Sequence, residues 1–500
     1  MKFYELPPAV NNSIPNTDIR PYVRVLFELK NEDLFIPNSD ILECVITSYK
    51  SVDGGIINNG YIILDNKKGF YTQESNPELT TDLHVQIWYC FGNNENTFHR
   101  FSLIVDENGF QNQETGFLDK TTTVKLVDFS TKLDNKKTQK NWTDTQTVVH
   151  SVVCDKENPD HSLVHIIAKR AGLEPSQINC GHLPFNLPFV FIDNTAWKEL
   201  CSLAKTYNAC VECGKDMALS FTESPYDTEN TYSEDSGFFL TEKEITHFRF
   251  FNNNETYANS IRLKYTRYVE TERQELWTYD DSPVWFNENM EPYYPFTGDT
   301  RKIISDNDYT AIYTAKNKDG KTRNVVFAEE IDDVETFLNN MITEDNKKFE
   351  VIQYDTTTYK DRAIIQLSRN GELIGLYKAS IYGKAIISET NFSCFVKDDS
   401  EIKEHGQIVK NVTSKYLSDD LFENVPFYER RANDLLNESK KDTKGYYLTT
   451  YLPLIHARVD ACMDIRLRSD GAIKKVKLEE ITFRYKKEAA FSTEMWVKTV

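Results

Sequence analysis

The sequence lacks long apolar runs. None of its 500 residues falls in an uninterrupted apolar stretch of about 18, the length that a membrane-spanning helix needs. The opening residues, MKFYELPPAVNNSIPN, also lack the apolar centre of a secretory signal peptide. The sequence therefore predicts no membrane span and no secretory signal.

Positive charge is also in short supply. The chain has 58 Lys and Arg against 77 Asp and Glu, for a net charge of −19. Because affinity for nucleic acid comes from cations that meet phosphates, this balance is a poor basis for gripping DNA or RNA. The same negative charge would keep a polyanion that slides past the surface from adhering to it.

The nine cysteines are odd in number and have no framework spacing, which favours reduced thiols. One pair, Cys210 and Cys213, has the spacing of a metal or redox motif. The alternation of residues 210–213 and 217–221 around Gly214 instead predicts two strands of a hairpin, which would put the two thiols on opposite faces. A zinc site needs four ligands, and no second Cys-X-X-Cys exists, although Cys180 and His182 could complete a set. We interpret the pair as small buried side chains.

Catalytic motifs are missing as well. The sequence contains no G-x-S-x-G, no P-loop and no G-x-G-x-x-G. His161 and His165 have metalloprotease spacing, but Ser162 stands where the activating Glu should be. We expect His161 to be solvated and His165 to lie on the exposed face of its helix. Carboxylates are abundant, which leaves a glycoside hydrolase pair open, yet no pattern singles one out. We therefore assign no catalytic, cofactor-binding or metal-binding residue and no cofactor.

Alternating apolar residues dominate the first 135 positions. The segments YVRVLFEL, HVQIWYCF and RFSLIV each place apolar side chains at every second position, as half-buried antiparallel strands do. We expect turns at Asp53-Gly54-Gly55, Asn58-Asn59-Gly60 and Asn108-Gly109. The polar stretch 130–147 is the best candidate for a first domain boundary.

Helical periodicity appears at three places. Residues 161–173 place Leu163, Ile166, Ile167 and Ala171 on one face. A second helix, capped by Asp193 or Asn194, has a stripe of Trp197, Leu200, Cys201, Ala204 and Tyr207. A third covers 427–441, with Ala432, Leu435 and Leu436 facing inward.

The remainder returns to strands. Residues 258–269 alternate Ile261, Leu263 and Tyr265 with polar residues, and strands again fill 461–500. Within this part we expect a short helix at 332–342 and a hairpin at 363–379 that turns at Asn370-Gly371. An aromatic-rich patch also lies here, which could bind sugar or a partner protein or form an ordered loop packed on itself; it comprises Trp277, Trp285, Phe286, Tyr293, Tyr294 and Phe296.

The order of these pieces resembles the baseplate hub and tail-tip hub proteins of phage tails and tail-like particles. Residues 22–66 and 99–135 are similar to the family's opening strands, although Leu103 stands where the family has Gly. The family's W-x-x-L-x-x-L-A helix and the small residue after it are matched by Trp197, Leu200, Leu203, Ala204 and Ala209. The strand 256–265 and the segment 429–497 follow in the family's order, with Val459-Asp460 where the family has Gly-Asp.

The resemblance implies a mainly β fold with α+β segments, built around two tube-like antiparallel β-barrels as in a hub. It divides the chain into an N-terminal barrel at 1–140 and an α+β domain at 148–235. A β-rich part at 236–420 then holds the second barrel with an insertion, and a helix and strands at 421–500 complete it.

The implied role is structural and not enzymatic. A homotrimeric ring of hubs would adapt the six-fold tail tube to a three-fold spike or fiber and let the genome pass without specific binding. The implied partners are the tail tube, distal tail and tape measure proteins above the ring, and a spike, central fiber or lysin below it. Such a protein belongs to the virion and assembles in the host cytoplasm. The alternatives are a tail-associated cell-wall hydrolase and a carbohydrate-binding tail protein.

Overall fold

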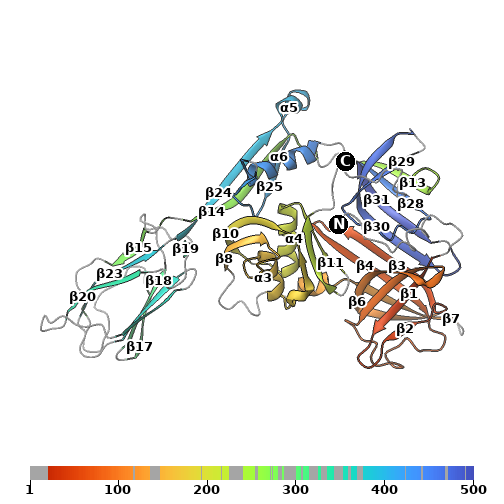
Figure 1. Cartoon of the computed structure of the whole chain (residues 1–500), viewed down its shortest axis with the longest axis horizontal. Helices are drawn as coiled ribbons and strands as arrows, with labels where there is room; N and C mark the ends of the chain where they lie inside the picture. Colours follow the sequence, from red (N-terminus) through yellow and green to blue (C-terminus); the bar gives the residue numbers. More distant parts are fainter. Residues whose placement is uncertain are drawn as a thin grey trace.

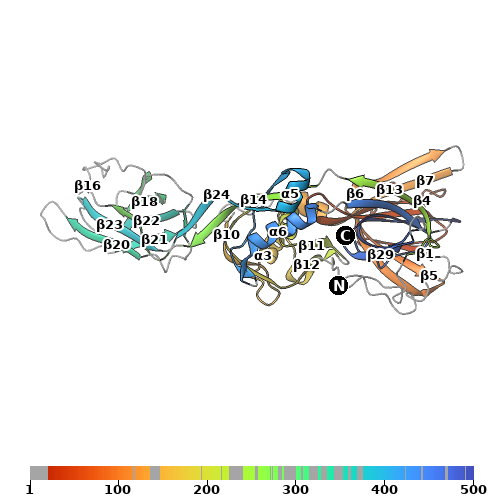
Figure 2. The same cartoon turned by 90° about the horizontal axis from the view of Figure 1, so that it is seen from above.

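The computed structural model describes the chain in segments, and it is mainly antiparallel β with few helices, as predicted. The described residues are 21–115, 119–135, 147–192, 194–214, 217–223, 240–253, 257–270, 272, the strands between 274 and 397, 398–422, 424–440, 443–467, 471–489 and 491–499. Figures 1 and 2 show an elongated molecule, with the N-terminal and C-terminal strands side by side at one end.

The N-terminal strands form where the alternation predicts them. Their inward residues, such as Val25, Phe27 and Ile87, are completely buried, because every second side chain faces one core. The strands are β1 (Pro21–Glu28), β2 (Leu34–Ile36), β3 (Ile41–Lys50), β4 (Gly55–Asp65), β5 (His84–Phe91), β6 (Asn93–Thr115) and β7 (Asp119–Val127).

Two of the three predicted turns in this part are wrong. Gly60 lies inside β4, and a Cβ there would stand 2.0 Å from the Val45 carbonyl oxygen, so the glycine permits close approach of β3. Gly109 lies inside β6, at the register shift between Val105 and Phe110. Gly60 therefore marks a close approach between two strands, and Gly109 marks a β-bulge, rather than turns. The turn at Gly54 is confirmed, with a φ of 105°.

The α+β segment contains the two predicted helices, and the predicted stripe of the second is buried. Its N-cap is Thr195 and not the residues before it; the Asn194 backbone N–H donates to Glu199 Oε1 at 2.9 Å. The elements are α2 (Ser130–Asn135), β8 (Thr147–Cys154), α3 (Leu163–Arg170), the 3-10 turn η2 (Pro175–Gln177), β9 (Ile178–Cys180), β10 (Leu183–Phe191), α4 (Ala196–Thr206), β11 (Ala209–Cys213) and β12 (Leu219–Glu223).

This segment is joined to the N-terminal strands through backbone pairing. Strand β11 runs parallel to β4, with Val211 opposite Gly55. A Cβ on Gly55 would lie 2.6 Å from the Trp197 ring, so the glycine lets α4 pack directly on β4. The helix and the sheet therefore share one tight contact.

Strands from the C-terminal part, together with β13 from the middle of the chain, extend the same sheet. Strand β30 pairs with β3, so segments more than 400 residues apart lie next to each other, and the hydroxyls of Thr47 and Thr482 are 2.9 Å apart. Among the described residues the sheet has fifteen strands, with the path β13-β28-β31-β30-β3-β4-β7-β6-β5-β1-β2. The added strands are β13 (Ile245–Asn253), β28 (Thr443–Thr450), β29 (Cys462–Arg466), β30 (Ile473–Lys486) and β31 (Ser492–Thr499).

One core fills the space inside this sheet. Tyr89 of β5 lies with its ring 5.8 Å from that of Phe483 on β30 and 5.7 Å from that of Phe491. Both halves of the chain thus bury aromatic rings in a single cluster, which holds them in a fixed relation.

A smaller sheet carries the predicted third helix. It contains β14 (Ser260–Glu270), β19 (Val325–Phe327), β24 (Ala385–Lys397) and β25 (Val409–Thr413). Helix α6 (Phe427–Lys440) buries Ala432 and Leu436 as predicted, and the short helix α5 (Asp399–His405) follows β24. Strands β26 (Leu421–Phe422) and β27 (Val425–Pro426) form a small antiparallel pair. The long strands β14 and β24 lead to the far end of the molecule (Figure 1).

The far end corrects two predictions. Residues 335–342, predicted as helix, form a strand that pairs with β23, because pairing with a neighbour outweighs local helical spacing. The predicted hairpin at 363–379 has its two strands, but β22 pairs with β18 and β21 while β23 belongs to another sheet. The strands are β15 (Gln274–Tyr279), β16 (Val284–Trp285), β17 (Thr300–Ser305), β18 (Asp308–Thr314), β20 (Glu335–Ile342), β21 (Gln353–Thr358), β22 (Arg362–Ser368) and β23 (Gly375–Gly383).

A buried histidine makes stability depend on pH. Burial and the nearby Arg100 lower the pKa of His456 to about 3, so the folded state keeps it neutral where the unfolded chain, with a pKa near 6.5, takes up a proton. Stability from this group is complete above pH 6.5 and falls as the pH drops toward 3. Between pH 6.5 and 5 we expect a loss of about 2 kcal/mol that His456→Gln does not show. Urea unfolding of both proteins across this range measures the difference.

The comparison with the variant is needed because Asp128 acts in the opposite direction. Burial raises its pKa to about 6, so the folded state binds this proton more tightly than the unfolded chain as the pH falls from 6. A matched variant of an exposed histidine, His161→Gln, should keep the wild-type pH profile. Parallel profiles for wild type and His456→Gln would contradict the prediction.

Candidate functional site

Cys210 and Cys213 are not arranged so that both thiols could bind one metal ion. Both lie on β11, which pairs antiparallel with β12 as predicted. Cys210 packs into the core of the large sheet and Cys213 into the core around α3 and α4, so the thiols are on opposite faces. Burial raises the pKa of Cys210 to about 12 and also raises that of Cys213. Among the described residues, no group of three or more His, Cys, Asp and Glu side chains is placed to hold a metal ion.

The prediction for His165 is wrong, while His161 is exposed as expected. His165 is only 4% exposed, and its Nδ1 lies 2.9 Å from Ser162 Oγ and 3.7 Å from Cys180 Sγ. The buried face of α3 is wider than predicted and includes Val164 and His165, which places His165 against Cys180 of β9. Burial lowers its pKa, so the imidazole is neutral at neutral pH.

Cys154 completes this thiol and imidazole cluster. Its Sγ donates to the Gly181 carbonyl at 3.3 Å, and its contact with Cys180 together with burial raises its pKa. A thiol with a raised pKa is a poor nucleophile, because the thiolate is the reactive form. Cys154 is therefore a poor nucleophile, whereas the hydrogen bond with Cys154 lowers the pKa of the Cys180 thiol. His182, the other suggested ligand, has a largely exposed side chain 3.7 Å from Asp155.

A buried set of charges lies where three parts of the chain meet. Arg458 forms an ion pair with Glu212 of β11, and the two side chains are only 6% and 8% exposed. Asp460, with 1% of its side chain exposed, accepts from Lys50 of β3 at 2.8 Å and Lys477 of β30 at 2.6 Å. Burial opposes ionisation of Asp460, but Lys477 and Lys50 outweigh it and hold its pKa well below its usual range.

These pairs act by fixing positions. A buried ion pair adds little net stability, but it strongly disfavours any arrangement that separates its partners. Glu212 belongs to the α+β segment, Lys50 to the N-terminal strands, and Arg458 and Asp460 to the C-terminal part. The charges therefore lock the three parts in one arrangement.

The large sheet ends on a strand with an open edge. Within the described residues β13 pairs with β28 alone. Phe248 and Phe250 lie opposite Leu448 and Tyr446, which are 1% and 3% exposed, yet the two phenylalanines are 42% and 50% exposed. The apolar face of the sheet thus continues to an edge that nothing in the described chain covers. We name Phe248 and Phe250 with their strand the β13 edge.

The other face of the same strand is organised too. The ring of Phe251 lies 5.3 Å from that of Tyr447 and 6.0 Å from that of Trp496. Phe251 fits because its neighbour on β28 is Gly445, where a Cβ would stand 2.1 Å from the Phe251 ring. This aromatic cluster stiffens β13 although the strand has one paired neighbour.

Reasoning from the sequence missed both the β13 edge and the buried charges. The alternation of His247, Phe248, Arg249 and Phe250 was the available signal for the edge. The charges gave no local signal, since their partners lie far apart in the chain. Of the predicted aromatic patch, Trp277 and Trp285 lie on β15 and β16, and the other four residues lie outside the described part of the chain.

In the described residues, no helix is long and apolar enough to cross a membrane.

In comparisons with known proteins, the solved structures similar to this chain include several tail proteins. No family model and no curated protein matches the sequence. Among solved structures, the chain aligns over 95% of its length with 96% of a tail protein from Neisseria meningitidis, at 7% identity and a TM-score of 0.49. The chain resembles tail proteins along nearly its whole length.

Two further tail proteins match as broadly. The 43 kDa tail protein of prophage MuSo2 from Shewanella oneidensis aligns over 95% of this chain and 98% of its own, at 8% identity and a TM-score of 0.47. A prophage tail protein from Listeria monocytogenes aligns over 95% and 94%, at 8% identity and a TM-score of 0.43.

Proposed function

We propose that this chain is a structural protein of the tail of a phage or phage-like particle, and that it acts as the hub at the tail tip or baseplate. The observation that carries the proposal is the large sheet. Both ends of the chain contribute to it, buried charges lock it, and it stops at the apolar β13 edge. A rigid sheet with an unpaired apolar edge is suited to assembly, since exposed edges pair with other chains.

The occupant we propose for the β13 edge is a second copy of this chain. A sheet that offers one edge to the next copy and receives the previous copy elsewhere makes a head-to-tail contact, and such contacts form a ring when the rotation between copies closes. With two barrel-like halves per copy, three copies present six, which suits a six-fold tail tube. The divisions at 1–140, 148–235, 236–420 and 421–500 remain a prediction within this proposal.

The charge of the chain fits passage of a genome through such a ring. Three copies carry three times the net charge of −19. Acidic residues that line the opening would repel DNA and prevent adhesion. The partners in this arrangement are the tail tube, distal tail and tape measure proteins on one side and a spike, central fiber or lysin on the other. The protein would be located in the virion after assembly in the host cytoplasm.

Light scattering and negative-stain imaging of the purified chain test the proposal. We expect a three-fold ring with a central opening, and we expect Phe248→Glu with Phe250→Glu to reduce it to monomers. A buried Phe contributes about 2 kcal/mol or more, and a charge at the same place costs further desolvation.

The matched control is Val52→Glu, since Val52 is apolar and 92% exposed away from β13. It should leave the ring intact, and circular dichroism should show all variants folded. A wild-type chain that stays monomeric even when tail tube protein is added, or a double variant that still forms rings, would contradict the proposal.

A further inference from the structure

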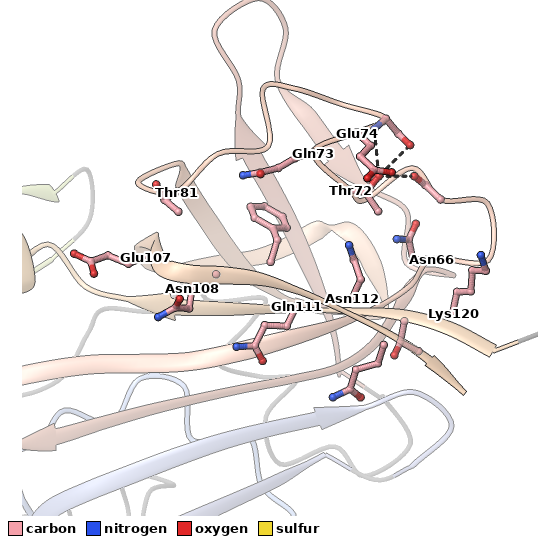
Figure 3. Close-up of a pocket in the computed structure, with 16 residues that line it drawn as sticks. Asn66, Thr72, Gln73, Glu74, Thr81, Glu107, Asn108, Gln111, Asn112 and Lys120 are labelled. Atoms are coloured by element: carbon pink, nitrogen blue, oxygen red, sulfur yellow. Dashed lines mark hydrogen bonds between the residues drawn. The ribbon is translucent and has the colours of Figure 1, made fainter. Parts of the chain in front are cut away.

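A polar pocket of about 670 Å³ lies at the end of the N-terminal strands, away from the β13 edge. Figure 3 shows its two walls: Gln73 and Thr81 come from the 66–83 connection between β4 and β5, and Asn108, Gln111 and Asn112 come from β6. The register shift between Val105 and Phe110 displaces β6 here, and this displacement helps to form the concave surface.

The lining has a distinctive chemistry. Amide and hydroxyl side chains dominate it, with one aromatic ring, two carboxylates and one lysine. These are Asn66, Gln73, Asn108, Gln111, Asn112, Gln113, Thr72, Ser75, Thr81, Thr121, Phe110, Glu74, Glu107 and Lys120. Each amide offers donors and an acceptor side by side, which is the pattern that vicinal hydroxyl groups require.

The floor of the pocket is fixed by hydrogen bonds. Asn66 is 4% exposed, and its Nδ2 donates to Thr122 Oγ1 at 2.8 Å. Thr122 Oγ1 donates in turn to Asn112 Oδ1 at 2.7 Å. Because this bond uses the oxygen of Asn112, its two N–H donors stay available to a ligand.

The walls are held as well. The Asn66 Oδ1 accepts from the Tyr71 backbone N–H at 3.0 Å, and the Tyr71 hydroxyl donates to Asp40 at 2.6 Å. Phe110 lies edge-on to Phe27, with centroids 6.2 Å apart. A pocket whose polar groups and ring are held in place before binding loses less entropy on binding.

We propose that this pocket binds a neutral, polyhydroxylated sugar. Two carboxylates against one lysine disfavour phosphate and other anions. The mainly polar lining disfavours an apolar ligand, since its groups would lose water without replacement. The Phe110 ring provides an apolar surface for the C–H face of a pyranose. This inference does not rest on ring formation, so either proposal can fail without the other.

Saturation-transfer NMR with the full chain tests the inference. The probes are neutral oligosaccharides that contain glucose, galactose, N-acetylglucosamine or rhamnose, with sialyllactose as the anionic comparator. We expect at least one neutral probe to bind with a Kd of about 1 mM or lower. Gln111→Ala and Gln73→Ala should each weaken it roughly tenfold, the effect of one lost hydrogen bond.

Both substitutions should leave the fold unchanged, because neither amide has a hydrogen bond within the described residues. The matched control is Asn158→Ala, an exposed amide outside the pocket, which should bind as wild type does. The inference is overturned if no neutral probe binds at about 10 mM, a concentration well above such a Kd. Binding of sialyllactose alone, or wild-type affinity in both pocket variants, also overturns it.

Discussion

Replacing Glu212 by Ala is expected to lower the free energy of unfolding by about 3–5 kcal/mol. The substitution removes the Glu212 carboxylate from its ion pair with the Arg458 guanidinium, which lies in a site that is 6% exposed. Urea unfolding followed by tryptophan fluorescence measures the change. The matched control, Glu242→Ala, removes an exposed carboxylate and should change the free energy by less than about 0.5 kcal/mol.

The double variant Glu212→Leu with Arg458→Met separates a lost charge pair from lost packing. It removes both charges and fills the space with apolar side chains of similar length, so it should recover most of the stability that Glu212→Ala loses. A loss below about 1 kcal/mol in the single variant, or a double variant as unstable as the single one, would show that the pair is solvated.

Replacing Trp197 by Ala is expected to cost about 3–5 kcal/mol, the usual range for a buried tryptophan. Trp197 is 4% exposed and packs against Gly55, so the substitution leaves a cavity between α4 and β4. The backbone of β11 and β4 is paired and cannot follow the smaller side chain inward. Calorimetry measures the lost stability as a lower midpoint temperature of the unfolding transition in which α4 separates from β4.

The neighbouring residue supplies the control. Lys198 is exposed on the same helix, and Lys198→Ala should be neutral, because Ala is at least as good a helix former. A loss well under 1 kcal/mol for Trp197→Ala would mean that α4 does not pack on β4 as the structure has it.

The Cys210 and Cys213 pair shows that local periodicity can predict the faces on which side chains lie. A period of two predicted opposite faces for the two thiols, and the structure puts them in two different cores. The His165 prediction failed because the buried face of α3 is wider than the predicted apolar stripe and includes Val164, His165 and Ala168.

The sequence by itself determined the elements whose pattern is local. Alternation placed β1, β5 and β14, and helical spacing placed the buried face of α4 and of α6, because burial of one face needs only a repeat within the segment. The order of these elements also carried the resemblance to the tail hub proteins.

Only the tertiary structure decided which segments meet. The pairing of β3 with β30, the ion pairs of Asp460 and the position of Gly60 inside β4 all depend on partners hundreds of residues away or on a neighbouring strand. The β13 edge also appeared only when its neighbours were known, since Phe248 looks like a core residue until it is seen that β13 pairs with β28 alone among the described strands. Pattern within a segment reports which face is apolar, whereas the identity of what covers that face is a property of the whole fold.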